Sequence, residues 1–303
     1  MKITLSFFPA LLAIVCFSCA HTPYGRGDRY FAKKEYAKAM TLYMNSEKER
    51  ANEILRSIDH PPADLQCDFF ELKMKIASDL DLLKKDAETI GLLERYESLN
   101  CGNNEDLIEK FYSGLRKLLG LDIIRAGDRF FIKGSLKKNI GDKYSALEYF
   151  KMGLRVNPKE EVYLQILIAT FRDFLKEIDS KMDRRQIPLF LVNDYPQFFS
   201  FISELYFRNP RINIPFTDKT KNEFSELTKE FTSVKATQPI TLFTNLNFQN
   251  QNSLILTIPI NQIIKISKIG DLPSKNYYIV YAPKETLVGF SGEVEPSSFA
   301  EIK

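Results

Sequence analysis

The sequence feature that most constrains the fold is the segment from Gly141 to Pro158, in the middle of the chain. Its apolar residues are spaced three, three and four positions apart, which is the spacing of one face of an α-helix. Pro158 ends that helix, because proline cannot continue one. Two small residues about two turns apart would let a neighbouring helix approach closely. The segment therefore predicts a helix packed against a partner, with a contact face formed by Tyr144, Ala146, Leu147, Phe150, Gly153 and Leu154.

A partner helix is predicted directly upstream, from Ile124 to Lys138, with Gly134 at the point where the two helices would cross. The pair resembles a unit of the tetratricopeptide-repeat family. Units of that family stack into solenoids that bind partners, so the resemblance implies binding rather than catalysis. The residues that stand at the spacing of the family signature are Gly134, Gly141, Ala146, Phe150, Gly153 and Pro158.

The same signature recurs near the start of the chain, and weaker helical patterns lie between the two copies. We therefore predict a tetratricopeptide-like helical domain over residues 22–185, built from roughly four helical hairpins. A longer helix over 160–182 closes the stack in this prediction. The first copy consists of Gly27, Tyr30, Ala39 and Tyr43, and the intervening helices are predicted over 64–83, 87–99 and 107–119.

At Pro239 the hydrophobic period changes from helical to alternating, which is the period of β-strands. Short β-branched and aromatic runs predict five or six strands in about 65 residues, which is typical of a small barrel. Residues 186–236 are predicted to form a helical extension and linker, with an amphipathic helix over 219–234. The predicted fold class is α+β multidomain: an α-helical tetratricopeptide-like solenoid followed by a small all-β barrel over 237–303. The strands are predicted over 241–248, 254–258, 263–269 and 277–282.

The predicted barrel resembles a bacterial SH3-like domain. The segment from Leu246 to Ile260 is similar to the opening of that family, and residues 277–280 and 287–290 are similar to its later strands. Bacterial members often bind cell-wall peptides or act as docking modules, so the resemblance implies a groove lined by aromatic side chains. The alternative is that most of these side chains pack the barrel. The candidate groove residues are Phe248, Tyr277, Tyr278, Tyr281 and Phe290.

The first residues predict export rather than a folded element. The apolar run from Ile3 to Val15 is long enough for the core of a signal peptide and too short to span a bilayer comfortably. Its end resembles a bacterial lipobox, with the small residue Ser18 directly before Cys19. The alternative is an ordinary secretory peptide cleaved near Ala20. The lipobox resemblance implies a signal peptide over 1–18 and a lipid-anchored N-terminus over 19–21, attached to the cell envelope and expected at the outer membrane.

Two cysteines remain beyond the predicted anchor, Cys67 and Cys101. They lie 34 residues apart, near the length of one helical repeat, and cysteines in an oxidising compartment can pair. A disulfide that closes a loop of this size contributes roughly 3–4 kcal/mol in the chain-entropy model. Two buried free thiols are the alternative, and the sequence leaves both open.

Charge and histidine content point away from nucleic-acid binding and from catalysis. The formal net charge of +3 over 303 residues gives no field that would draw the chain to nucleic acid. Its two histidines, His21 and His60, have no metal-ligand partner at a useful spacing. We therefore predict a non-catalytic adaptor without cofactor or metal, whose partners are other envelope proteins or peptides. The alternative is that the SH3-like domain binds peptidoglycan.

Overall fold

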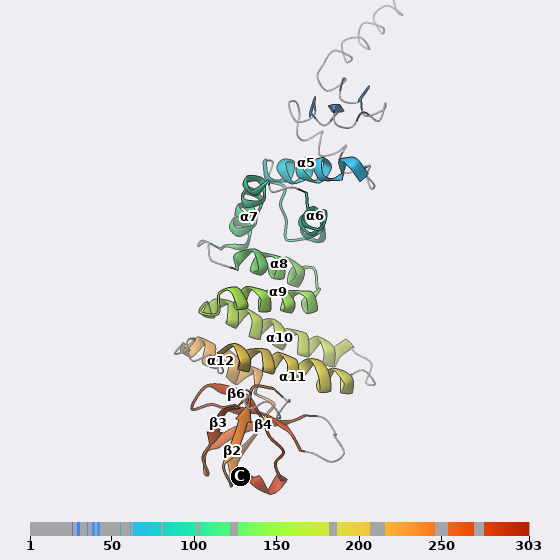
Figure 1. The fold of residues 1–303 in the computed structure, drawn as a ribbon. Helices are drawn as coiled ribbons and strands as arrows, with labels where there is room; N and C mark the ends of the chain where they lie inside the picture. The colour runs from blue at the N-terminus through green and yellow to red at the C-terminus, as the bar shows by residue number, and fades with distance from the viewer. Residues whose placement is uncertain are drawn as a thin grey trace, which may run out of the picture. The chain divides into compact units, whose positions relative to one another are not determined.

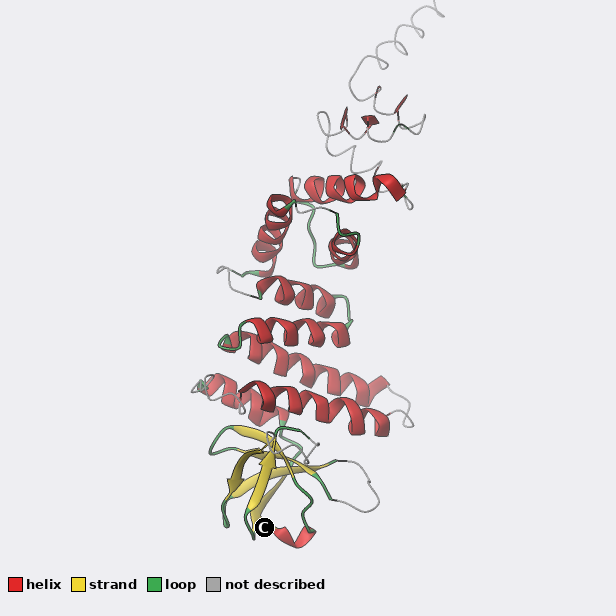
Figure 2. Cartoon of the chain, in the orientation of Figure 1, coloured by secondary structure: helices red, strands yellow, loops and turns green. Residues whose placement is uncertain are grey.

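The computed structural model contains two compact units, the first ending at Ile123 and the second beginning at Ile124. The first unit is helical where it is described, and the second consists of helices followed by a curled antiparallel sheet (Figure 1, Figure 2). The predicted signal peptide and Cys19 lie outside the described residues. The structure describes residues 26, 29–30, 35, 38–39, 41–42, 55, 61, 63–79, 81–101, 104–121, 127–181, 187–206, 216–245, 254–269 and 276–302.

The helices described between residues 63 and 121 pack around one apolar core. They are α5 (Gln66–Asp79), α6 (Ala87–Ser98) and α7 (Glu105–Leu119), and a short 3-10 turn (Ala63–Leu65) precedes α5. The helix predicted over 64–83 is therefore shorter than expected. Because apolar residues recur on one side of each helix, they bury together. The buried side chains are Phe69, Leu72, Met74, Ile76, Ile90, Leu93, Tyr96, Leu107, Phe111, Tyr112 and Leu115.

Local polar groups fix the ends of α6 and α7. The Asp86 side chain accepts a hydrogen bond from the backbone N–H of Thr89 at 3.0 Å, and that of Asn104 accepts one from Leu107 at 3.3 Å. These bonds satisfy N–H groups that the first turn of a helix leaves unpaired. Gly120 ends α7 in the left-handed conformation, with a φ of 70° that glycine adopts without steric strain.

The helices of the second unit continue past residue 185, where the predicted helical domain ended. The helix predicted over 160–182 is α10, and it packs against both α9 and α12. It therefore does not close the stack, because further helices follow it and bury apolar side chains in the same core. The helices are α8 (Asp128–Asn139), α9 (Lys143–Val156), α10 (Glu161–Lys181), α11 (Ile187–Tyr206) and α12 (Asp218–Leu227).

The hairpin of α8 and α9 is close-packed because each helix places a glycine against an aromatic ring of the other. A Cβ added to Gly134 would lie 2.5 Å from the Phe150 ring, and one added to Gly153 would lie 2.4 Å from the Phe131 ring. The two ring centroids are 5.0 Å apart. Ala146 is fully buried. The predicted close approach of these two helices is confirmed, but Tyr144 of the predicted contact face is 56% exposed.

Replacing Gly134 by leucine is expected to lower the free energy of unfolding of the second unit by about 3 kcal/mol, the upper part of the range for overpacking a core. The Phe150 ring is itself fully buried and cannot swing away. Gly91, on α6, is the matched control, because an added Cβ there meets no atom within 4 Å. Gly91→Leu should raise stability by up to about 1 kcal/mol through helix propensity alone. Urea denaturation followed by circular dichroism measures both, and equal effects would contradict the close packing.

The sheet begins earlier in the chain than predicted. Residues 219–234 were expected to form one amphipathic helix, but α12 ends at Leu227 and the first strand begins at Thr232. Residues 232–236 form a strand rather than a continuation of the helix because Val234 and Ala236 are buried and alternate with exposed residues. The strand also pairs with the strands on both sides of it. The strands are β1 (Thr232–Ala236), β2 (Ile240–Phe243), β3 (Leu254–Ile258), β4 (Ile263–Lys268), β5 (Tyr278–Ala282), β6 (Leu287–Ser291) and β7 (Phe299–Glu301), in the order β3-β2-β6-β5-β4-β1-β7.

The curled sheet is buried on both faces at its centre. Every residue of β5 and of β6 is buried, although successive side chains of a strand point to opposite faces. One face lines the inside of the curl. The other face packs against helices and contributes to the core that also contains Phe131 and Phe150. The strand residues on this helix-facing side are Ile279, Tyr281, Val288 and Phe290, together with Ile269 after β4.

Helices α11 and α12 hold the sheet by specific contacts. The Ser203 hydroxyl donates a hydrogen bond to the backbone carbonyl of Val288 at 2.6 Å, and both residues are buried. The Phe224 ring stacks on the Tyr281 ring with centroids 6.2 Å apart. The predicted domain boundary at 237 falls after β1 and separates residues that pack in one core. Helices α8 to α12 and the sheet are therefore one unit.

Candidate binding groove between α5 and α6

The aromatic residues predicted to line a groove on the barrel do not face one another. Tyr281 and Phe290 are buried on the helix-facing side of the sheet, and Tyr277 packs partly buried against the same core. Tyr278 lies on the opposite face, with its ring centroid 5.1 Å from that of Phe299. Burial raises the pKa of the Tyr281 hydroxyl. Phe248 lies outside the described residues. The four described aromatic side chains therefore pack on two faces of the sheet and do not line one groove.

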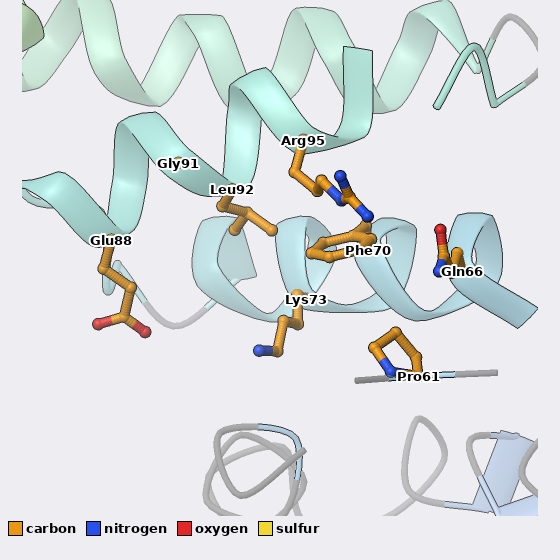
Figure 3. Close-up of a pocket in the computed structure, with 8 residues that line it drawn as sticks. All are labelled: Pro61, Gln66, Phe70, Lys73, Glu88, Gly91, Leu92 and Arg95. Carbon is orange, nitrogen blue, oxygen red and sulfur yellow. The ribbon is translucent and has the colours of Figure 1, made fainter. Parts of the chain in front are cut away.

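A hollow of about 440 Å³ lies instead in the first unit, between α5 and α6 (Figure 3). Its volume falls within the range of about 300–1,000 Å³ that small-ligand pockets occupy. We call it the α5–α6 groove. Its lining residues are Pro61, Gln66, Phe70, Lys73, Glu88, Gly91, Leu92 and Arg95.

The helical period explains why these side chains share one groove. Gln66, Phe70 and Lys73 are spaced four and three residues apart, so they lie along one face of α5. The lining residues of α6 begin at Glu88 and end at Arg95 with the same spacing. The other faces of both helices are occupied by the buried side chains of the core. The groove therefore lies along the junction of the two helices, on the side away from their core.

The groove combines apolar and charged surface. Phe70 packs edge-to-face on the buried Phe69, with ring centroids 5.4 Å apart, and the Lys73 ammonium lies 4.8 Å from the Phe69 centroid. Arg95 reaches from α6 toward Phe70, whereas Glu88 lies at the other end of α6 (Figure 3). The two cations and the single carboxylate give the lining a positive balance.

Gly91 leaves the backbone of α6 open at the groove. A Cβ added there would meet no atom within 4 Å, and the residue is exposed. A bound chain can therefore approach the α6 backbone closely at this point, which a larger side chain would prevent.

A disulfide joins Cys67 and Cys101, so the structure adopts the paired one of the two alternatives that the sequence left open. Cys67 directly follows the groove residue Gln66, and Cys101 lies in the loop between α6 and α7. The Asn104 amide also donates a hydrogen bond to the Glu71 carboxylate at 2.5 Å. The bridge and this hydrogen bond fix the start of α5 against the loop that follows α6, and so hold one end of the groove.

The groove was missed by sequence analysis, although two signals pointed to it. Phe70 follows the core residue Phe69, and Leu92 precedes the core residue Leu93. Adjacent residues of a helix point about 100° apart, so one residue of such a pair can lie at the edge of the core. The positions of Lys73 and Arg95 beside these residues depend on how the two helices pack, which the sequence pattern does not reveal.

Within the ranges that the structure describes, His, Cys, Asp and Glu side chains form no group of three or more that could hold a metal ion. Both histidines lie outside those ranges.

Among the described helices, none is long and apolar enough to cross a membrane. The sequence matches no protein-family model and no curated protein.

Proposed function

We propose that this chain is an exported, lipid-anchored protein of the cell envelope that binds partner proteins through its helical part and catalyses no reaction. The observation that carries the proposal is the α5–α6 groove, an open and partly apolar site on a helical unit closed by a disulfide. Grooves between helices commonly receive peptide segments. Because disulfides persist mainly in oxidising compartments, the Cys67–Cys101 bridge supports export.

The finer architecture in this proposal is a tetratricopeptide-like stack followed by an SH3-like barrel. The α8–α9 hairpin supports the first part, since its small residues accept aromatic rings of the facing helix. The curled seven-stranded antiparallel sheet supports the second. Because Tyr278, Tyr281 and Phe290 are buried, we assign the sheet a structural role in the proposal rather than the binding of cell-wall peptides.

Cys19→Ala is expected to move most of the protein from the membrane pellet to the soluble fraction, because the lipid on that sulfur would be the anchor. Cell fractionation and immunoblotting measure the change. Cys16→Ala is the control, since it lies within the predicted signal peptide and leaves Cys19 in place. Wild-type protein that incorporates no labelled palmitate would contradict the lipid anchor.

The adaptor role and the binding of peptidoglycan differ in a sedimentation experiment. The full chain, purified in detergent, is mixed with insoluble purified peptidoglycan and centrifuged. The proposal expects the protein to remain in the supernatant, because the aromatic side chains of the sheet are packed in its cores. Retention in the pellet, lost on competition with soluble wall fragments, would contradict the assignment of a structural role to the sheet.

A further inference from the structure

We propose that the α5–α6 groove binds a short acidic peptide segment of a partner protein, with one large apolar side chain placed between carboxylates. The inference rests on the proposed partner-binding function and names the chemistry of the ligand. It is carried by three features of the groove: its apolar surface, the distribution of its charges and its open α6 backbone.

The apolar surface accommodates the apolar side chain of the ligand. Phe70 and Leu92 come from different helices and both line the hollow, each only partly buried. Phe70 cannot turn into the core, because the buried Phe69 ring already lies against it. An apolar side chain placed between Phe70 and Leu92 would therefore remove apolar surface of both helices from water. A hollow of about 440 Å³ is large enough for one aromatic side chain and its flanking backbone.

The charges select an acidic ligand. Lys73 on α5 and Arg95 on α6 line the groove on either side of the space between Phe70 and Leu92 (Figure 3), so carboxylates flanking a bound apolar side chain would each meet a cation. Arg95 can bind a carboxylate through two parallel N–H groups, which fixes its orientation. Glu88 lies at the far end of α6 (Figure 3), where it would repel a ligand that continued as an acidic run. The groove therefore favours a short acidic segment over a long one.

Fluorescence anisotropy with three labelled pentapeptides tests this chemistry on the full chain purified in detergent. The first probe has phenylalanine between two aspartates, the second has lysines in place of the aspartates, and the third has serine in place of the phenylalanine. We expect wild-type protein to bind the aspartate probe at least about ten-fold more tightly than either other probe, and more weakly as salt screens the charges.

Variants of the groove separate binding from folding. Lys73→Glu combined with Arg95→Glu should reverse the order of the aspartate and lysine probes. Lys75→Glu combined with Lys117→Glu changes the net charge equally at exposed positions that do not line the groove, and should leave the order unchanged. Gly91→Leu fills the open space at α6 and should weaken all binding at least ten-fold, whereas Ser113→Leu on α7 should not.

Three outcomes would overturn the proposal. In the first, wild-type protein binds the aspartate and lysine probes equally, so the groove does not select by charge. In the second, the Lys73→Glu and Arg95→Glu double variant still prefers the aspartate probe, so the selection arises elsewhere. If no probe binds and Gly91→Leu changes the oligomeric state in analytical ultracentrifugation, the groove holds a second copy of this chain. Failure of the proposed function is distinguishable from these outcomes, because the aspartate probe would still bind purified protein while no partner contacts the groove in cells.

Discussion

Ala146→Arg is expected to unfold the second unit as one body, sheet included. Ala146 is fully buried on α9, and its carbonyl oxygen lies 3.1 Å from the position that a Cβ on Gly134 would occupy. An arginine must either push α8 away or bury its charge, so we expect a loss of at least about 3 kcal/mol. Because the core that contains Ala146 also contains Val288 and Phe290 of the sheet, the damage should not stop at the helices.

Limited proteolysis with mass spectrometry measures the extent of unfolding. Helices α8 to α12 and strands β1 to β7 should become sensitive to protease together. Met152→Arg is the control, since Met152 lies on the same helix and is 42% exposed. If residues 237–303 of the Ala146→Arg variant persist as a protected fragment while the helices are cleaved, the sheet folds alone and the shared core does not couple them.

Replacing both Cys67 and Cys101 by serine is expected to lower the free energy of unfolding of the first unit by about 3–4 kcal/mol. The bridge spans a sequence separation of 34 residues. Closing a loop of that size lowers the entropy of the unfolded chain, which corresponds to roughly 3–4 kcal/mol of stability. The described helices of this unit, α5, α6 and α7, are short. The loss is therefore a large share of the free energy of unfolding that such a small unit can reach.

Urea denaturation with and without a phosphine reductant checks this expectation on wild-type protein. A fluorescent label in each unit separates the two transitions. Reduction should shift only the transition of the first unit, and the double serine variant should show that shift without reductant. A reductant that leaves both transitions in place would mean that the bridge contributes nothing to the folded unit.

The elements that sequence analysis predicted best are those whose pattern is local. The α8–α9 hairpin follows from the spacing of Gly134, Ala146 and Phe150, which are close in sequence and meet in space. Strands β2 and β4 follow from alternation along the chain, and β5 follows from a short run of β-branched and aromatic residues. In both cases the residues that carry the pattern lie within one element or in two neighbouring elements. The hydrophobic period of the sequence is therefore sufficient to predict these elements.

The start of the sheet was mispredicted because two periods overlap there. Phe224, Leu227, Phe231 and Val234 continue a helical stripe, and Val234 also fits a strand. What decides in favour of β1 is its pairing with β4 and β7, which lie far along the chain. Long-range pairing of this kind overrides local propensity and leaves no mark in a single segment.

For the described candidate groove aromatics the structure adopts the stated alternative, in which they pack in the cores, for a related reason. Tyr281 and Phe290 had suitable positions for a groove on an isolated barrel, but α11 and α12 cover that face of the sheet. The sequence does not reveal which face a distant helix covers. Conversely, the α5–α6 groove depends on which residues of two helices meet, so Phe70 and Arg95 gave no recognisable motif.

The most direct test of partner binding by the helical part is site-specific photocrosslinking in intact cells. A photoreactive amino acid is placed at Glu88, an exposed residue at one end of the groove, and in a second strain at Ile263, which is 57% exposed on β4. We predict a discrete crosslinked partner from position 88, lost in the Lys73→Glu and Arg95→Glu double variant, and none of comparable yield from position 263. Crosslinks that form at position 263 and not at position 88 would contradict partner binding through the groove.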